Sequence, residues 1–437
     1  MSYRQLQTKV ISPGLCARCG LCCGVCPVRA ITMDEDGYPR LTGRCTECGF
    51  CTGCCPGADV DFPALSREVF NTEYDLSNEL GCVEKLLVAH AGDKSVRAMG
   101  TSGGVVTALL VYLLEQGEID GAVVAGMDPD NPCRSVGLLA TTAEEIKSAA
   151  MSKYCLTPSL EALSEIRKRK GRFAVAGLPC QVQGLRKLAK VDPTLSGKIV
   201  CILGLYCNCN MERNGHLEAM RACGIESVDV QRFQFRGGPW PGGFQVIKKN
   251  GDKVALHRMR YSDLINVMFR LYGAKRCYLC YDALSEYADI SCGDFHAADY
   301  DGSLGQLTGC TLVSQRTLRG KQFLKMAEEA GALVMHHLPM DRMSKRIAGM
   351  AKSKKNRCIV RLQRLLHKKQ PIPNYHFFLP EPSTKARRSE FYYRLFFLFR
   401  GRWARTAILR LLFSPLGDYM ARINVKRKKM FCNYHGN

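Results

Sequence analysis

Two short cysteine runs, CARCGLCCGVCP at residues 16–27 and CTECGFCTGCCP at residues 45–56, decide how the N-terminal part of this chain folds. Both runs have the spacing C-x2-C-x2-C-x3-C-P. The first contributes Cys16, Cys19, Cys22 and Cys26, and the second contributes Cys45, Cys48, Cys51 and Cys55. A glycine follows the second cysteine of each run, where a tight turn can aim backbone N–H groups at sulfur.

This spacing is that of bacterial ferredoxins, in which the fourth cysteine of each run ligates the other run's 4Fe-4S cluster. The spacing therefore predicts two crossed ligand sets. One set is Cys16, Cys19, Cys22 and Cys55, and the other is Cys45, Cys48, Cys51 and Cys26. Zinc held by CxxC pairs is the alternative, but two identical four-cysteine runs that each end in Cys-Pro favour clusters. Cys23 and Cys54 are surplus, and we expect them to be buried bystanders.

The composition indicates a cytoplasmic globular protein with unevenly placed charge. Its 437 residues are 46% hydrophobic, enough for two or three cores. The 24 cysteines indicate reduced, metal-bound thiols, and no apolar signal segment opens the sequence, so we expect a cytoplasmic location. The net charge is +22, yet residues 341–437 alone hold 24 Lys and Arg against 4 Asp and Glu. The basic character therefore belongs to a C-terminal extension.

We expect a protein of class α+β or α/β in four parts. A two-cluster ferredoxin-like domain (1–66) and a linker (67–85) precede a mixed α/β domain (86–340) and a basic amphipathic helical extension (341–437). In the α/β part, predicted strands alternate with predicted helices, which is typical of a largely parallel sheet covered on both faces. The strands are at 85–90, 121–126, 173–177 and 198–207, and the helices at 105–117, 143–149 and 181–190. Residues 225–262 alternate like antiparallel strands between Gly-rich turns.

Two segments are candidates for binding a phosphate-bearing cofactor. Residues 100–104 read GTSGG between a predicted strand and helix, where backbone N–H groups can close on a phosphate. A plain turn is equally compatible with this pattern. Residues 152–154 place a lysine between two hydroxyl side chains, with a surface loop as the alternative. The candidate residues are Thr101, Ser102, Gly103, Gly104, Ser152, Lys153 and Tyr154.

A third group of cysteines is scattered through the α/β part. Cys180 and Cys207 follow predicted buried strands, where open α/β sheets place their binding crevices, and Cys277 and Cys280 form a CxxC pair. Four thiols gathered there are suited to a third cluster, although buried core cysteines are the alternative. Asp289 and Asp294, in the segment ADISCGD, are expected at a strand end near the site or in a plain turn.

The combination of several motifs in one order resembles the family formed by the beta subunits of coenzyme F420 hydrogenases and dehydrogenases. The motifs are SGGVVTALLVYLLEQGEIDGAVV, SKY, GLPCQVQGLRKL, the GLYC strand and CYLCYDALSEYADISCGD. The resemblance covers roughly residues 85–335, with the ferredoxin unit fused in front. It implies FAD near residues 101–104 and 152–154, and a third 4Fe-4S cluster on Cys180, Cys207, Cys277 and Cys280. Four further cysteines crowd the same regions: Cys155, Cys201, Cys209 and Cys292.

The function that this resemblance implies is an iron-sulfur flavoprotein oxidoreductase. It would pass electrons between a small-molecule hydride carrier, such as reduced coenzyme F420, and ferredoxin-type clusters through FAD, with a ferredoxin or another redox subunit as partner. The alternatives are an electron-transfer subunit without its own substrate, or a ferredoxin-dependent reductase of another conjugated compound. The basic residues follow no known nucleic-acid module, so no nucleic-acid partner is expected.

The C-terminal extension carries its own prediction. From Ser389 onward, aromatic and aliphatic residues cluster heavily with arginines between them, and no acidic residue lies between Glu390 and Asp418. A helix of this composition can lie in a membrane–water interface, and the run at 426–429 would add attraction to anionic lipid. A helical hairpin packed on the body and a docking surface for an acidic protein are the alternatives.

Overall fold

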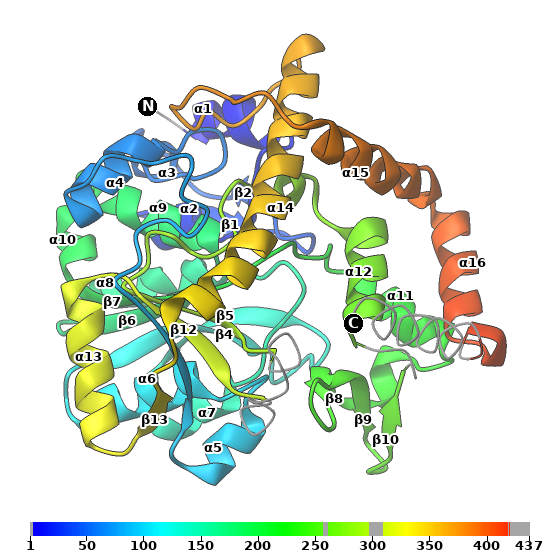
Figure 1. Ribbon diagram of the computed structural model, residues 1–437, viewed down its shortest axis with the longest axis horizontal. Coiled ribbons are helices and arrows are strands. Elements are labelled where there is room, and N and C mark those ends of the chain that lie inside the picture. The colour runs from blue at the N-terminus through cyan, green and yellow to red at the C-terminus, as the bar shows by residue number, and fades with distance from the viewer. Residues whose placement is uncertain (1–2, 257–260, 297–308, 418, 420–437) are drawn as a thin grey trace.

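The computed structural model describes the chain except for residues 1–2, 257–260, 297–308, 418 and 420–437. Its centre is a sheet with helices on both faces (Figure 1). The described strands of this sheet have the order β13-β3-β12-β11-β7-β6-β4-β5. The strands are β3 (Lys85–Ala91), β4 (Gly121–Met127), β5 (Ser135–Ala140), β6 (Phe173–Gly177), β7 (Ile199–Leu205), β11 (Ile290–Asp294), β12 (Thr311–Gln315) and β13 (Leu333–His336). Every strand and helix predicted between residues 85 and 207 is present within one to three residues of its predicted bounds.

The sheet is mixed, whereas the sequence pattern predicted a largely parallel one. The central strands β4, β6, β7 and β11 pair in parallel, but β5, β12 and β13 pair antiparallel with their neighbours. The connection from β4 to β5 is the loop 128–134, too short for the crossover that a parallel pair requires. A short helix, α5 (Lys94–Met99), also lies between β3 and the glycine-rich loop, so that loop connects two helices.

Alternation along the strands assigns one core to each face of the sheet. In β6, Phe173 and Val175 point into one core and Ala174 into the other. The Ala174 face packs against α6 (Val105–Glu115) and α13 (Leu318–Glu329), with α7 (Ala143–Ser148) beside them. The Phe173 face packs against α8 (Leu163–Lys168), α9 (Pro179–Val191) and the N-terminal unit. α10 (Pro193–Gly197) leads from α9 into β7.

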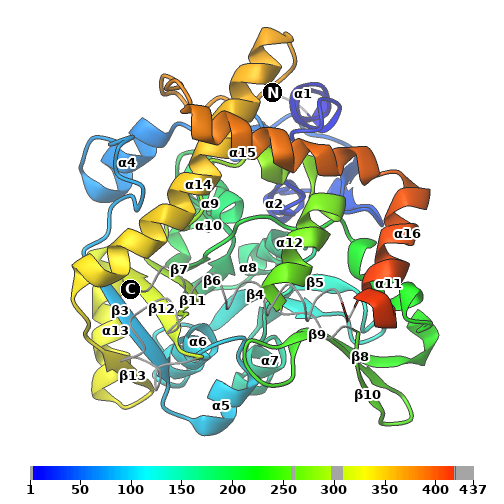
Figure 2. The ribbon, with the colours of Figure 1, turned by 45° about the vertical axis from the view of Figure 1, so that its right-hand side comes forward.

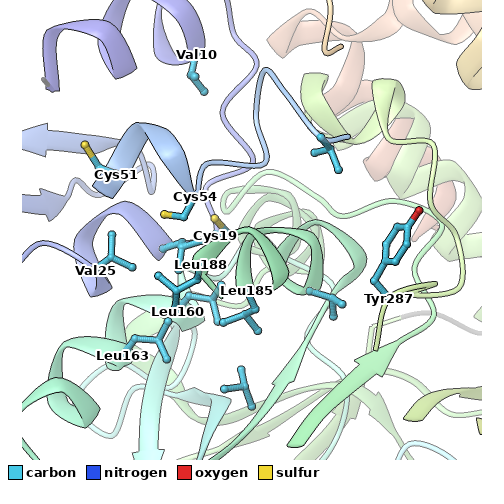
Figure 3. Packing of buried hydrophobic residues seen from close by; sticks show 14 of the residues in the cluster. Val10, Cys19, Val25, Cys51, Cys54, Leu160, Leu163, Leu185, Leu188 and Tyr287 are labelled. Carbon is cyan, nitrogen blue, oxygen red and sulfur yellow. The ribbon is translucent and has the colours of Figure 1, made fainter. Parts of the chain in front are cut away.

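The N-terminal unit is built into this second layer rather than tethered to it. Its elements are α1 (Tyr3–Leu6), η1 (Gln7–Ile11), α2 (Leu21–Gly24), β1 (Ile31–Met33), β2 (Pro39–Leu41), α3 (Phe50–Gly53) and α4 (Phe62–Phe70). Val25 and Cys54 share a core with Leu185 and Leu188 of α9 (Figure 3). α4 spans the boundary predicted at residue 66. The segment predicted as a linker (67–85) is also held against the α/β part, because Arg316 donates hydrogen bonds to the carbonyl oxygens of Leu80 and Cys82.

A smaller antiparallel sheet stands beside the main one, as the pattern at 225–262 predicted. It contains β8 (Val230–Gly237), β9 (Gly243–Lys248) and β10 (Lys253–Ala255) in the order β10-β9-β8. Its core includes Phe233, Phe235 and Phe244, and it packs against α11 (Gly215–Ala222) and α12 (Tyr261–Tyr272). η4 (Lys275–Leu279) then returns the chain to β11.

The C-terminal helices pack around the outside of the rest of the molecule (Figure 2). α14 (Met340–His367) places Met343 and Ile347 against the β3 and β12 end of the sheet, and Cys358 and Leu362 in the core shared with the N-terminal unit. α15 (Thr384–Leu395), η7 (Phe396–Phe399) and α16 (Arg402–Leu412) continue along the outside of α11 and α12. Among the described helices, none has the length and apolar character needed to cross a bilayer. The run at 426–429 lies outside the described residues.

Candidate functional site

The ferredoxin-type cysteines gather in the two crossed sets that their spacing predicts. One small hollow is lined by Cys16, Cys19, Cys22 and Cys55. A second is lined by Cys26, Cys45, Cys48 and Cys51. We call these the first and second thiol sets. In each, the fourth thiol comes from the other run. The surplus Cys23 and Cys54 are buried in the core, as expected.

Equivalent turns shape the two runs. Gly20 and Gly49 precede α2 and α3 with φ of 83° and 81°, a conformation that glycine adopts without strain. Backbone N–H groups donate to the sulfurs, from Arg18 to Cys16 at 3.4 Å and from Glu47 to Cys45 at 3.4 Å. Similar bonds reach Cys26 (3.2 Å) and Cys55 (3.3 Å). Hydrogen bonds of this kind stabilise thiolate charge and tune cluster potentials.

Three distant parts of the chain bring the scattered cysteines together in a third thiol set. Cys180 begins α9 after β6, Cys207 follows β7, and Cys277 and Cys280 lie in and just after η4. Burial raises the pKa of Cys180 well above its usual value, and the neighbouring thiols of Cys280, Cys19, Cys277 and Cys207 raise it further. Since Cys19 is among these neighbours, the third set lies beside the first. The first and second sets also adjoin, because Cys22 is an electrostatic neighbour of Cys51.

The thiols of the first and second sets surround hollows and do not converge on one point. Within the described residues, no three His, Cys, Asp or Glu side chains converge closely enough to hold one metal ion. Tetrahedral zinc needs four ligands converging on one point at ~2.3 Å for sulfur, whereas here the ferredoxin thiols surround hollows. Buried thiols with raised pKa values must also release their protons when iron binds.

The four further cysteines of the α/β part, Cys155, Cys201, Cys209 and Cys292, differ in whether they lie near the third thiol set. Cys201 and Cys292 lie in the core on the far face of the sheet, among α6 and α13. Cys155 bonds to Ser135 at 3.1 Å. Among these four, Cys209 adjoins the third set, because its side chain interacts with that of Cys277 and lowers the pKa of Cys277 below its usual value.

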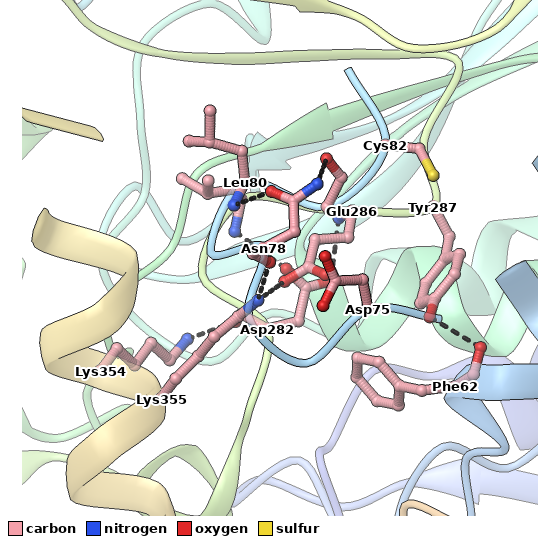
Figure 4. Close-up of polar contacts among 12 residues, drawn as sticks. Phe62, Asp75, Asn78, Leu80, Cys82, Asp282, Glu286, Tyr287, Lys354 and Lys355 are labelled. Carbon is pink, nitrogen blue, oxygen red and sulfur yellow. Dashed lines mark hydrogen bonds and ion pairs between the residues drawn. The ribbon is translucent and has the colours of Figure 1, made fainter. Parts of the chain in front are cut away.

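Buried cations surround the third set, and nothing in the sequence signalled them except an arginine directly before Cys277. Arg276 donates to the carbonyl oxygens of Gly57 (2.9 Å) and Pro56 (3.0 Å), next to Cys55. Lys354 of α14 donates to the carbonyl oxygens of Cys207 (2.6 Å) and Asp282 (2.7 Å). Its neighbour Lys355 pairs with buried Glu286 at 2.8 Å (Figure 4). α14 is therefore part of this site.

A separate pocket, with a volume of about 300 Å³, lies where the glycine-rich loop meets the small sheet. Small residues and two arginines line it, together with a tryptophan: Arg97, Ala98, Gly100, Thr101, Ser102, Met151, Gln234, Arg236, Gly237, Gly238, Trp240, Pro241, Gly242 and Gly309. Pockets for small ligands are commonly ~300–1,000 Å³. The lining suits an anionic ligand with a flat ring, because guanidinium groups recognise phosphate and aromatic faces stack on rings.

The predicted cofactor residues are brought together in part. The Thr101 hydroxyl accepts from the Ser152 N–H at 2.7 Å, which joins the two predicted segments, and Thr101 and Ser102 line the pocket. Tyr154 lies behind the pocket, where its hydroxyl accepts from Arg236 at 3.0 Å. Lys153 turns away and donates to the Ala149 and Ala150 carbonyl oxygens. Burial, with nearby Arg232, lowers the pKa of Lys153 to about 7.

Gly103 and Gly104 serve packing rather than the pocket. The Gly103 N–H donates to the Thr311 hydroxyl at 3.0 Å, and a Cβ on Gly103 would lie 2.5 Å from the Ala89 carbonyl oxygen. Gly104 begins α6 with φ of 73°, and a Cβ there would lie 2.8 Å from the Val96 carbonyl oxygen. A bulky side chain at either position would disturb the sheet or helix whether or not a ligand binds.

The two aspartates of the ADISCGD segment have different roles. Asp289 accepts from the Ile202 N–H (2.8 Å), Arg186 (3.0 Å) and Thr317 (2.9 Å), so it ties three elements together. Asp294 pairs with the Arg236 guanidinium at 2.8 Å and thereby fixes a side chain of the pocket wall. Sequence reasoning missed Arg97, Arg236 and Trp240, although the Gly-rich segment RGGPWPGG around Trp240 was a usable signal.

A continuous path of contacts joins the pocket to the third thiol set. Tyr154, bonded to Arg236 at the pocket wall, accepts the Met211 N–H through its backbone carbonyl at 3.1 Å. Met211 follows Cys209 and Asn210, and Cys209 contacts Cys277. The pocket and the three thiol sets are therefore connected one after another through neighbouring residues, and we call this connected series the row.

Comparison with known proteins identifies relatives of this chain. Residues 86–164 match the N-terminal domain, and residues 170–340 the C-terminal domain, of the coenzyme F420 hydrogenase/dehydrogenase beta subunit. The coenzyme F420 hydrogenase subunit beta of Methanococcus voltae is 30% identical over 58% of this chain and 84% of its own length. A subunit of the F(420)H(2) dehydrogenase of Methanosarcina mazei is 28% identical over 74% of this chain and 84% of its own length.

Two further matches extend this picture. The coenzyme F420-dependent sulfite reductase of Methanocaldococcus jannaschii is 29% identical over 75% of this chain, which spans about half (48%) of that relative. A chain of the F420-reducing [NiFe] hydrogenase complex from Methanosarcina barkeri superposes with a TM-score of 0.54 at 25% identity, over 69% of this chain and 99% of that one. With both domains matched in order, this chain belongs to the family of coenzyme F420 hydrogenase/dehydrogenase beta subunits.

Proposed function

We propose that this chain is an oxidoreductase that moves electrons between a small hydride carrier and a redox partner protein. The carrier is reduced coenzyme F420 or a similar compound, which the names of the relatives support. FAD would occupy the pocket at Thr101, and three 4Fe-4S clusters would occupy the three thiol sets. The carrying observation is the position of Cys180, which neighbours both the other third-set thiols and Cys19 of the first set.

The residues of the chain supply binding and orientation for these groups. When bound, a flavin exchanges hydride for single electrons, and clusters carry those electrons onward. Arg97 would hold the flavin's diphosphate. The buried Arg236 pairs with Asp294 and Tyr154 and would support the pocket wall behind it. Trp240 offers an aromatic face in the same pocket.

The second thiol set marks the outer end of the row. Cys48 is exposed, as are Thr42, Gly43 and Arg44 beside it, whereas Cys280 of the third set is buried. A partner protein can therefore approach the second set closely, and we infer that a ferredoxin or a redox subunit docks there. The matched chain of the Methanosarcina barkeri complex is likewise part of a larger assembly.

The test is anaerobic purification with iron, sulfide and flavin quantified, followed by turnover with a dye acceptor. We expect about twelve irons and one flavin per chain, and dye reduction by reduced coenzyme F420. Full cofactor content without turnover of reduced F420 or NAD(P)H would instead support the second candidate, an electron-transfer subunit with no substrate of its own. Protein without flavin or clusters would contradict both.

The flavin site has a sharper test in a matched pair on α5. Arg97 lines the pocket, whereas Lys94, three residues earlier, is exposed and does not. Because a hydrogen bond to a charged group contributes ~1.5–3 kcal/mol, Arg97→Gln should weaken FAD binding about 10- to 100-fold. Lys94→Gln should leave the dissociation constant unchanged in a fluorescence titration. Equal affinities in the two variants would place the flavin elsewhere.

A further inference from the structure

The C-terminal segment 383–417, which contains α15, η7 and α16, has two apolar faces, although one is enough to hold it on the body. The inner face contributes Tyr393, Phe397 and Leu409 to the core beside α11 and α12. Two ion pairs fasten it, from Arg361 of α14 to Glu390 (2.7 Å) and from Arg405 to Glu218 (3.2 Å). The helices are thus fixed in place without help from their outer side.

The outer face exposes large apolar side chains to solvent. Trp403 is 90% exposed, Leu398 76% and Tyr392 66%, and Phe391, Leu395, Phe399 and Leu411 are also exposed. Figures 1 and 2 show α15 and α16 along the outer edge of the molecule, away from the sheet. Contiguous apolar surface of this kind on a folded protein usually marks a binding face.

The exposed charge within this segment is basic, although Arg387 pairs with exposed Glu381 just before the segment at 2.7 Å. Exposed Lys385, Arg387, Arg388, Arg394, Arg402 and Arg410 lie on the same segment. The single acidic residue between 383 and 417 is Glu390, which is buried and already paired with Arg361. The exposed surface of the segment therefore combines aromatic rings and guanidinium groups without any carboxylate.

This combination selects one occupant. Tryptophan and phenylalanine settle at the headgroup level of a bilayer, and basic residues beside them attract anionic lipid. We propose that α15, η7 and α16 form a peripheral contact with the surface of an anionic phospholipid bilayer. This contact is independent of the redox chemistry proposed above, and it would hold the row of thiol sets close to a membrane.

The experiment uses the full chain, purified anaerobically with its clusters, and vesicles of neutral phosphatidylcholine or of an equimolar mixture with phosphatidylglycerol. We expect sedimentation with the anionic vesicles, little with neutral ones, and a strong decrease at high salt. Trp403 is exposed, so its fluorescence emission should shift to the blue when it enters the bilayer surface. Because the chain has two tryptophans, Trp403→Phe identifies the source of the shift and should remove it.

Variants localise the contact. Replacing Phe391, Leu398 and Trp403 together by serine should weaken vesicle binding at least tenfold, as should replacing Arg388, Arg394 and Arg402 by glutamine. The matched control replaces Val228 and Leu318, which are 73% and 74% exposed elsewhere on the body, by serine. Iron content checks that each variant is folded.

Two results would overturn the proposal. One is the absence of vesicle binding by the wild type at low salt. The other is undiminished binding by the apolar variant, which would attribute the interaction to charge elsewhere. Recruitment only by an acidic redox protein, with no vesicle binding, would likewise assign this face to a protein partner.

Discussion

All three thiol sets consist of cysteines, but the first two are assembled in a different way from the third. The first two come from residues 16–55, where two repeated runs and two left-handed glycines place each sulfur. The third draws on the ends of β6 and β7, on η4 and on the cation that α14 supplies. The first two sets are thus a property of local sequence, and the third is a property of the completed fold.

This difference teaches where each site is vulnerable. The first and second sets need their turns and one thiol from the neighbouring run, whereas the third set requires distant elements to stay in register. Arg276 links the third set to the first, since it directly precedes Cys277 and its side chain donates hydrogen bonds to the carbonyl oxygens of Pro56 and Gly57. A change confined to one set should therefore leave the others intact, unless it disturbs their shared packing.

The largest expected effect is the loss of one cluster. Cys280→Ser should remove about four irons per chain and leave the ferredoxin pair in place, because serine is a poor ligand for soft iron-sulfur sites. The measurement is iron and sulfide content with electron paramagnetic resonance of the reduced protein. The control is Cys201→Ser, a buried thiol on the far face of the sheet that should keep all the iron. Loss of the ferredoxin signals instead would refute the ligand sets.

A smaller effect should follow from disturbing the contact between the first run and the body. A Cβ on Gly20 would lie 2.4 Å from the Pro158 carbonyl oxygen, whereas one on Gly117 meets nothing within 4 Å. Both glycines have positive φ, so alanine costs ~1 kcal/mol of backbone strain at either position. Overpacking should raise the cost of Gly20→Ala to about 3 kcal/mol.

Anaerobic denaturant unfolding of the two variants measures this difference. If Gly20→Ala and Gly117→Ala destabilise the protein equally, the first run is not held by its contact with Pro158. Loss of the first-set cluster in Gly20→Ala at full global stability would show instead that the strain stays local.

The sites differ in the same way in how far the sequence predicts them. The crossed grouping of the first two thiol sets was predictable, because the spacing of cysteines within one short segment fixes their geometry. For the third set, the residues alone offered two interpretations, strand-end thiols gathered for a cluster or buried core cysteines, and the resemblance to other proteins favoured the first. The proximity of Thr101 and Ser152 was predicted from two short polar segments, but Arg236 comes from β8 of a separate sheet and Trp240 from the loop that follows it. The packing role of Gly103 was invisible without the position of β12.

The smallest predicted effect tests whether α14 tunes the third cluster or merely covers it. Burial opposes the charge of Lys354, but the Cys280 and Cys207 thiols and Asp282 outweigh it and raise its pKa. A buried positive charge favours the more negative, reduced cluster, so Lys354→Met should lower one midpoint potential by on the order of tens of millivolts, where ~59 mV is a tenfold change for one electron. Lys354→Arg should largely restore it.

The matched control is Lys352→Met on the same helix, an exposed lysine paired with Glu79 at 2.7 Å. A redox titration followed by electron paramagnetic resonance should show one of three signals displaced in Lys354→Met and none in Lys352→Met. Unchanged iron content in both variants separates tuning from loss of the cluster. If Lys354→Met keeps twelve irons and all three potentials, the lysine serves only to anchor α14 through the carbonyl oxygens of Cys207 and Asp282. The third set would then depend on the helix for its position and not for its electrostatics.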